Sequence, residues 1–79
     1  MKLIICLRGK PKNPDKYKYN VETVFLDFES TKHEDLLIIA KNRIISAPCS
    51  LLFSDAGKIL LRVNGIAPKT YINKVLESQ

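Results

Sequence analysis

The chain has 79 residues, of which 46% are hydrophobic and 27% charged, and this composition indicates one small globular domain, residues 1–79, rather than a disordered segment. No apolar run approaches the roughly 20 residues of a bilayer-spanning helix, and the first residues lack the features of a secretory signal. We therefore expect a cytoplasmic protein without a membrane segment. Two cysteines, Cys6 and Cys49, and one histidine, His33, at unrelated spacings predict no metal site, and no cofactor is expected.

An apolar run at Lys2–Leu7 predicts a short buried strand, and the residues after it carry most of the formal net charge of +5. Residues 8–18 hold five basic side chains against one acidic side chain, and the basic ones are Arg8, Lys10, Lys12, Lys16 and Lys18. Gly9, Pro11 and Pro14 predict a loop here, with one short turn of helix from Pro14. Because Tyr17 and Tyr19 interleave with these lysines, the loop is a candidate for phosphate, acidic protein or nucleic-acid binding.

Val21–Phe28 is the second predicted strand. Its alternation places Val24, Leu26 and Phe28 on one face and Asp27 on the other, where Asp27 lies at a polar sheet edge or opposite Arg62.

A helix near residues 32–42 follows this strand. Thr31 and Glu34 form the pattern of a capping box, and His33 is expected to be exposed in the first turn. The expected buried stripe consists of Leu36, Leu37, Ala40 and Ile44. Because such a helix is long enough for a right-handed crossover, we expect the strands before and after it to be parallel.

Two strands, Cys49–Phe53 and Lys58–Val63, flank a four-residue gap that ends in Gly57 and predicts a hairpin. Pro68 fits the first position of a closing helix, whose apolar face is expected to contain Tyr71, Ile72, Val75 and Leu76. The predicted fold class is therefore α/β or α+β, with a mixed sheet and at least two helices.

From about residue 21 to about residue 78, this order resembles the C-terminal part of thioredoxin-like proteins. The resemblance rests on Phe25–Glu29, the following helix, Ser46–Cys49 with its Pro48, the hairpin Gly57, and Gly65 before the last helix. It implies a minimal thioredoxin-like βαββα core with a cis Ala47–Pro48 bond. In that family the backbone beside this proline holds an extended peptide next to the active-site sulfur atoms.

The N-terminal part departs from the thioredoxin pattern, because no Cys-x-x-Cys motif occurs and the first helix is reduced or missing. Without a low-pKa thiolate at a helix N-terminus, the physical basis of dithiol exchange is lost. Thioredoxin-like chains that lack both cysteines act as binding modules.

The preferred hypothesis is therefore a non-catalytic module that binds a protein partner, a role that would suit a viral or mobile-element protein directed at a host factor. Its expected binding residues are Ala47, Pro48, Cys49, Arg8, Lys10, Lys12 and Lys16.

One alternative is a thiol-redox protein that acts through Cys49, with Cys6, although both cysteines are also ordinary core residues. A bridge between them requires Cα atoms within about 7 Å. A further alternative is nucleic-acid binding through residues 8–19. No other catalytic constellation is present, and the sequence leaves the oligomeric state open.

Overall fold

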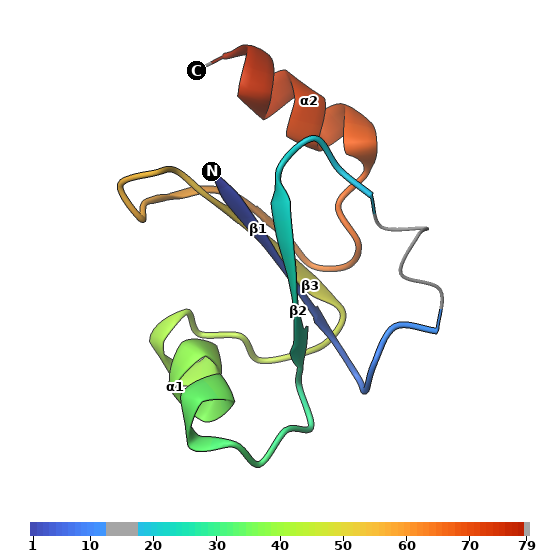
Figure 1. The fold of residues 1–79 in the computed structure, drawn as a ribbon, viewed down its shortest axis with the longest axis vertical. Coiled ribbons are helices and arrows are strands. Elements are labelled where there is room, and N and C mark those ends of the chain that lie inside the picture. The colour runs from blue at the N-terminus through green and yellow to red at the C-terminus, as the bar shows by residue number, and fades with distance from the viewer. Residues whose placement is uncertain (13–17, 79) are drawn as a thin grey trace.

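The computed structural model describes residues 1–12 and 18–78, which form a mixed sheet with two helices and hence a small α+β domain (Figure 1). Within these residues the elements are β1 (Lys2–Leu7), β2 (Glu22–Asp27), α1 (His33–Lys41), β3 (Cys49–Phe53), β4 (Ile59–Val63) and α2 (Lys69–Glu77). The four strands and α1 each lie within one residue of their predicted ranges. Pro68 is the residue before α2 rather than its first residue. The predicted turn from Pro14, with Lys16 and Tyr17, lies outside the described residues.

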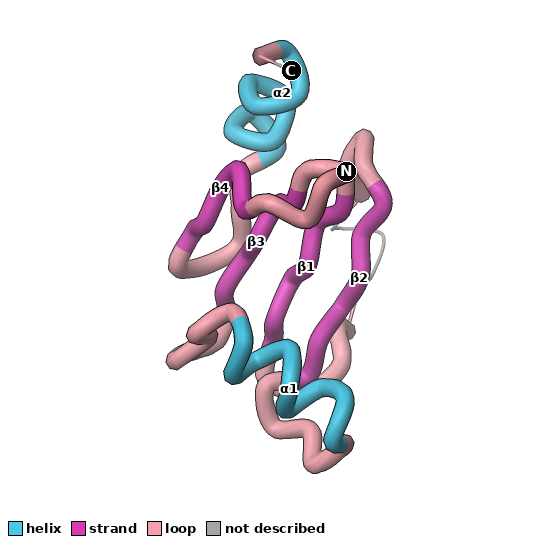
Figure 2. The backbone as a smooth tube through the Cα atoms, turned by 90° about the vertical axis from the view of Figure 1, so that its left-hand side faces the viewer, coloured by secondary structure: helices cyan, strands magenta, loops and turns pink. Residues whose placement is uncertain are grey.

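The strand order in the sheet is β2-β1-β3-β4, and the strands are seen side by side in Figure 2. β1 is parallel to β2 and antiparallel to β3, and β3 is antiparallel to β4. The prediction that the strands flanking α1 are parallel is therefore wrong. Residues 42–48 return the chain to the end of the sheet where β2 finished, so β3 enters on the other side of β1 and runs opposite to β2.

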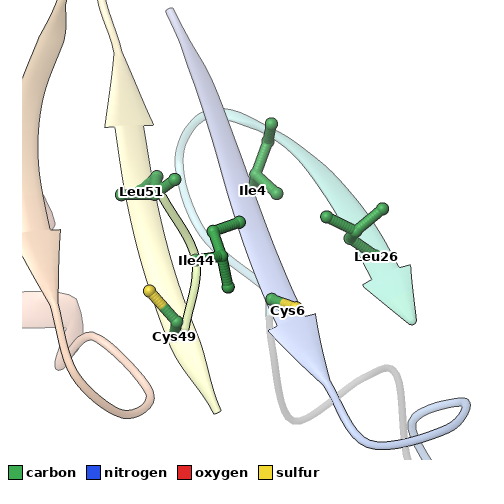
Figure 3. Packing of buried hydrophobic residues seen from close by; sticks show 6 residues of the cluster. All are labelled: Ile4, Cys6, Leu26, Ile44, Cys49 and Leu51. Atoms are coloured by element: carbon green, nitrogen blue, oxygen red, sulfur yellow. The ribbon is translucent and has the colours of Figure 1, made fainter. Parts of the chain in front are cut away.

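The sheet has an apolar cluster on each face. Ile4, Cys6, Leu26, Cys49 and Leu51 lie on the α1 side together with Ile44 (Figure 3). Leu3, Ile5, Leu52, Ala67 and Ile72 lie on the α2 side. Because β1 and β3 are covered on both faces, their sequences are apolar runs instead of alternating patterns.

The start of α1 differs from the predicted capping box. Lys32 is the residue before the helix, and no side chain caps the first turn. Instead, the Ser30 hydroxyl donates to Asp35 Oδ2 at 2.6 Å and accepts the Lys32 N–H at 3.2 Å. Since α1 begins after Lys32, Thr31 lies one position too early to act as its cap. The two hydrogen bonds of Ser30 instead connect the residues before the helix to Asp35 in its first turn.

The end of α1 is a Schellman turn, a six-residue helix end with one residue in the left-handed region. Arg43 is that residue, with φ of +52°. Its N–H donates to Ala40 O at 3.2 Å, and the Ile44 N–H donates to Ile39 O at 3.0 Å. Ile44 is consequently turned into the α1-side cluster, where it is buried.

The Arg62 side chain, on β4, binds this turn and so connects it to the sheet. Its guanidinium donates from Nη1 to Asn42 O at 2.7 Å and from Nη2 to Arg43 O at 2.6 Å. These carbonyls follow the last helical turn, where a cation is favourable. The alternative that places Arg62 opposite Asp27 is therefore wrong, because Arg62 binds the carbonyls after α1.

The buried side of α1 also differs from the predicted stripe. Leu36 and Leu37 are 47% and 55% exposed, and Ala40 is exposed as well. Ile38 and Ile39 pack against the sheet instead. Ile44 is buried as expected, but through the turn after the helix rather than through helical periodicity. The helix therefore presents an apolar side to solvent.

The packing of α2 against the sheet can be tested directly, because Ile72 is fully buried while its neighbour Tyr71 is 50% exposed. We expect Ile72→Ala to lower the free energy of unfolding by about 2–4 kcal/mol, since it leaves a cavity against the sheet. Tyr71→Ala, the matched control on the same helix, should lower it by less than about 1 kcal/mol. Urea denaturation followed by circular dichroism measures both, and equal losses would contradict the placement of α2.

Candidate functional site

The candidate site lies where β1 and β2 end and β3 begins, the lower end of the sheet in Figure 2. Cys6 is in register with Leu26 on one side and with Cys49 on the other. The basic loop after β1 and the Pro48 segment before β3 therefore leave the sheet at the same end. The two parts of the predicted binding surface, about 40 residues apart in the chain, therefore lie at one end of the sheet.

Asp27 fixes the start of the basic loop. Its Oδ1 accepts the N–H of Gly9 at 2.9 Å and the N–H of Glu29 at 2.9 Å. Gly9 has φ of +84°, a left-handed conformation that other residues rarely adopt. Asp27 Oδ1 thus accepts two main-chain donors, which gives Asp27 a structural role at the edge of the site.

The basic residues of the site differ in whether their charged groups contact other side chains. The Arg8 guanidinium lies 5.5 Å from the centre of the Phe28 ring, and its Nη1 is 3.7 Å from the Glu29 carboxylate. Lys10 and Lys12 are exposed and form no ion pair with any described residue. Lys10 and Lys12 are therefore better placed than Arg8 to meet an acidic partner.

Residues 45–48 form an exposed segment that enters β3 at this same end of the sheet, and the Ala47–Pro48 peptide bond is cis. Ile45 is 87% exposed, Ser46 and Pro48 are exposed, and Ala47 packs partly against the α1-side cluster. The main-chain groups of Ser46 and Ala47 make no hydrogen bond to another described residue. The segment thus offers open main-chain donors and acceptors between two exposed apolar side chains.

Sequence reasoning included Ala47 and Pro48 but missed Ile45. Its exposure follows from the turn at Arg43, which sends Ile44 inward and leaves the next side chain outside. The sequence marks Ile45 only as an apolar residue between a helix and a proline, which does not distinguish an exposed side chain from a buried one.

Cys6 and Cys49 are register partners on β1 and β3, and both are free and buried (Figure 3). Burial is the main cause that raises the pKa of the Cys6 thiol to about 11, with smaller contributions from Cys49 and Asp27. Burial also raises the pKa of the Cys49 thiol, against an opposing effect of Arg62. Both groups are thiols near neutral pH, and a thiol is a poor nucleophile.

The Tyr19 side chain makes contacts within the folded domain. Its hydroxyl donates to Ala67 O at 2.6 Å, and its ring packs against the α2-side cluster. This position removes Tyr19 from the stacking platform on which the nucleic-acid alternative depended. His33 is exposed at the start of α1, and no group of three or more potential metal ligands occurs among residues 1–12 and 18–78.

A groove of about 520 Å³ lies at the opposite end of the sheet, beside the C-terminal half of α1. Ile4, Ile38 and Phe53 form its apolar part, and Lys2 and Lys41 stand among the polar residues around it. It contains none of the predicted binding residues.

The chain matches no protein-family model, and searches of curated proteins and of solved structures also found no match. Neither helix in the described part of the chain combines the length and apolarity needed to cross a membrane.

The anchoring role of Asp27 can be tested by comparing two substitutions. We expect Asp27→Ala to lower the free energy of unfolding by about 1–3 kcal/mol, because the N–H groups of Gly9 and Glu29 lose their acceptor. Asp27→Asn keeps an oxygen acceptor and should lose less than half as much. Urea denaturation measures the loss, and equal effects of the two variants would show that the charge, not the hydrogen bonds, matters.

The raised thiol pKa values predict slow alkylation of the native protein. With a pKa of about 11 in place of 9.0, Cys6 forms the reactive thiolate only as the pH approaches 11. Its reaction with iodoacetamide near pH 8 should be at least about 100-fold slower in the native protein than in urea. Each of the variants Cys6→Ala and Cys49→Ala retains a single cysteine, so mass spectrometry of alkylation in each variant measures the rate of the remaining thiol. A Cys49 that reacts equally fast in both states would support the thiol-redox alternative.

Proposed function

We propose that the chain is a redox-inactive, thioredoxin-like module that binds an extended acidic segment of a protein partner. The observation that carries this proposal is the exposed segment of residues 45–48, in which the main-chain groups of Ser46 and Ala47 lack partners among the described residues. Such groups can pair with an extended peptide, which binds by adding main-chain hydrogen bonds. Ile45 and Pro48 supply apolar contacts on either side.

The thioredoxin-like part of the proposal is supported by connectivity. From β2 onward the chain runs strand, helix, strand, strand, helix, and Pro48 directly precedes β3. This is the order that the sequence resemblance implies. The two buried thiols with raised pKa values argue for binding rather than dithiol exchange.

The charge of the site indicates an acidic partner. Lys10 and Lys12 project from the loop that leaves the sheet at the same end as Pro48, and neither is neutralised by a described residue. Lysines at the rim of a binding surface accelerate association with a partner of opposite charge and select against basic partners. Nucleic acid is a weaker candidate for this loop, because Tyr19 is held in the fold.

Selection from a random peptide library tests the proposal. We expect the selected peptides to contain Asp or Glu next to an apolar residue. Fluorescence anisotropy with the synthetic peptides should show at least about tenfold weaker binding for Lys10→Glu/Lys12→Glu and for Ile45→Asp.

The matched control is Lys58→Glu/Lys74→Glu, which changes the net charge equally but lies on the β3–β4 hairpin and on α2. This variant should bind within about twofold of the parent protein. Failure to select peptides, or equal loss in the control, would overturn the proposal. Tighter binding to a single-stranded oligonucleotide than to any peptide would favour the nucleic-acid alternative.

A further inference from the structure

The outer side of α1 is an apolar surface on a nine-residue helix. Leu36 and Leu37 are about half exposed, and Ala40, one turn from Leu36, lies beside them on the outer side. Ile38 and Ile39 face the sheet, so α1 is apolar on two opposite sides. A helix of this kind is normally covered on both sides.

The charges beside this surface are arranged with opposite signs at the two ends of α1. Glu34 lies in the first turn and Lys41 in the last. Lys41 follows Glu34 by seven positions, close to two helical turns, so both lie along the same side of the helix. Both are exposed, and neither forms an ion pair with another described residue.

A surface with an apolar centre, a negative end and a positive end is complementary to itself when one copy is reversed. We propose that the occupant of this surface is a second copy of the chain, with the two α1 helices packed antiparallel about a two-fold axis. Leu36 and Leu37 of each copy then contact those of the other, and the small Ala40 side chain permits close approach. Glu34 of each protomer meets Lys41 of the other, so the ion pair forms twice.

Self-complementarity is the reason to favour a second copy over an unrelated partner. An antiparallel arrangement also places the positive end of each helix dipole beside the negative end of the other. The contact is small compared with the roughly 1,600 Å² of a standard interface, so the dimer should be weak, with a dissociation constant on the order of 10–100 µM.

Charge reversal tests the proposal by sedimentation equilibrium across that concentration range. Glu34→Lys places two lysines opposite each other, and Lys41→Glu places two glutamates opposite each other. Each variant should weaken self-association at least about tenfold. Mixing the two variants should restore a heterodimer, because every contact then joins Lys to Glu. The double variant Glu34→Lys/Lys41→Glu should again form a homodimer.

Rescue by mixing separates the interface from folding, since two misfolded variants would not restore each other. Leu37→Asp should abolish dimers while leaving the circular dichroism spectrum unchanged, because Leu37 is 55% exposed. A monomer at high micromolar concentration, or dimers indifferent to both charge reversals, would overturn the proposal. Peptide binding at residues 45–48 can be measured on Leu37→Asp, which cannot dimerise, so failure of this inference is distinguishable from failure of the proposed function.

Discussion

Covering both faces of the central strands is the constraint on which the rest of the structure depends. All of Leu3, Ile4, Ile5 and Cys6 on β1 are buried, yet the described chain provides only two nine-residue helices to cover them. α1 contributes no fully buried residue. Segments between the helices and strands therefore complete the core, with Ile44 on one face and Ala67 on the other. In a domain of this size such irregular segments are part of the packing.

Irregular segments can pack in the core only if their main-chain groups are satisfied. Ser50, a buried polar residue of β3, shows how this is done. Its hydroxyl donates to Gly65 O at 2.7 Å and accepts the Ala67 N–H at 3.0 Å, which holds the segment before α2 against the sheet. Arg62 does the same for the turn after α1. Ser50 thus positions the segment before α2, and Arg62 positions the turn after α1.

The local elements could be predicted from the sequence, whereas their long-range arrangement could not. The apolar runs of β1 and β3 are clear because those strands are buried on both faces. The direction of β3 depends on where residues 42–48 lead, which no local pattern records. The sequence left open which side of α1 faces the sheet, because residues 36–40 are all apolar and so more than one helical face could be buried. At the site, the place of Pro48 was predictable. The exposure of Ile45 was not, because it follows from a left-handed Arg43 where glycine is the usual signal.

The turn held by Arg62 lies between the outer side of α1 and the segment of residues 45–48. Anything that orders the turn from one side lowers the entropy still to be lost on the other side. If the proposed dimer and the proposed peptide both order this turn, their binding would be thermodynamically linked, and such linkage is reciprocal. The factor by which the proposed dimer would change peptide affinity would then equal the factor by which the peptide changes dimer affinity. Under these two proposals, Arg62 on the edge strand β4 would influence that shared factor through the carbonyl groups of Asn42 and Arg43, without touching either ligand.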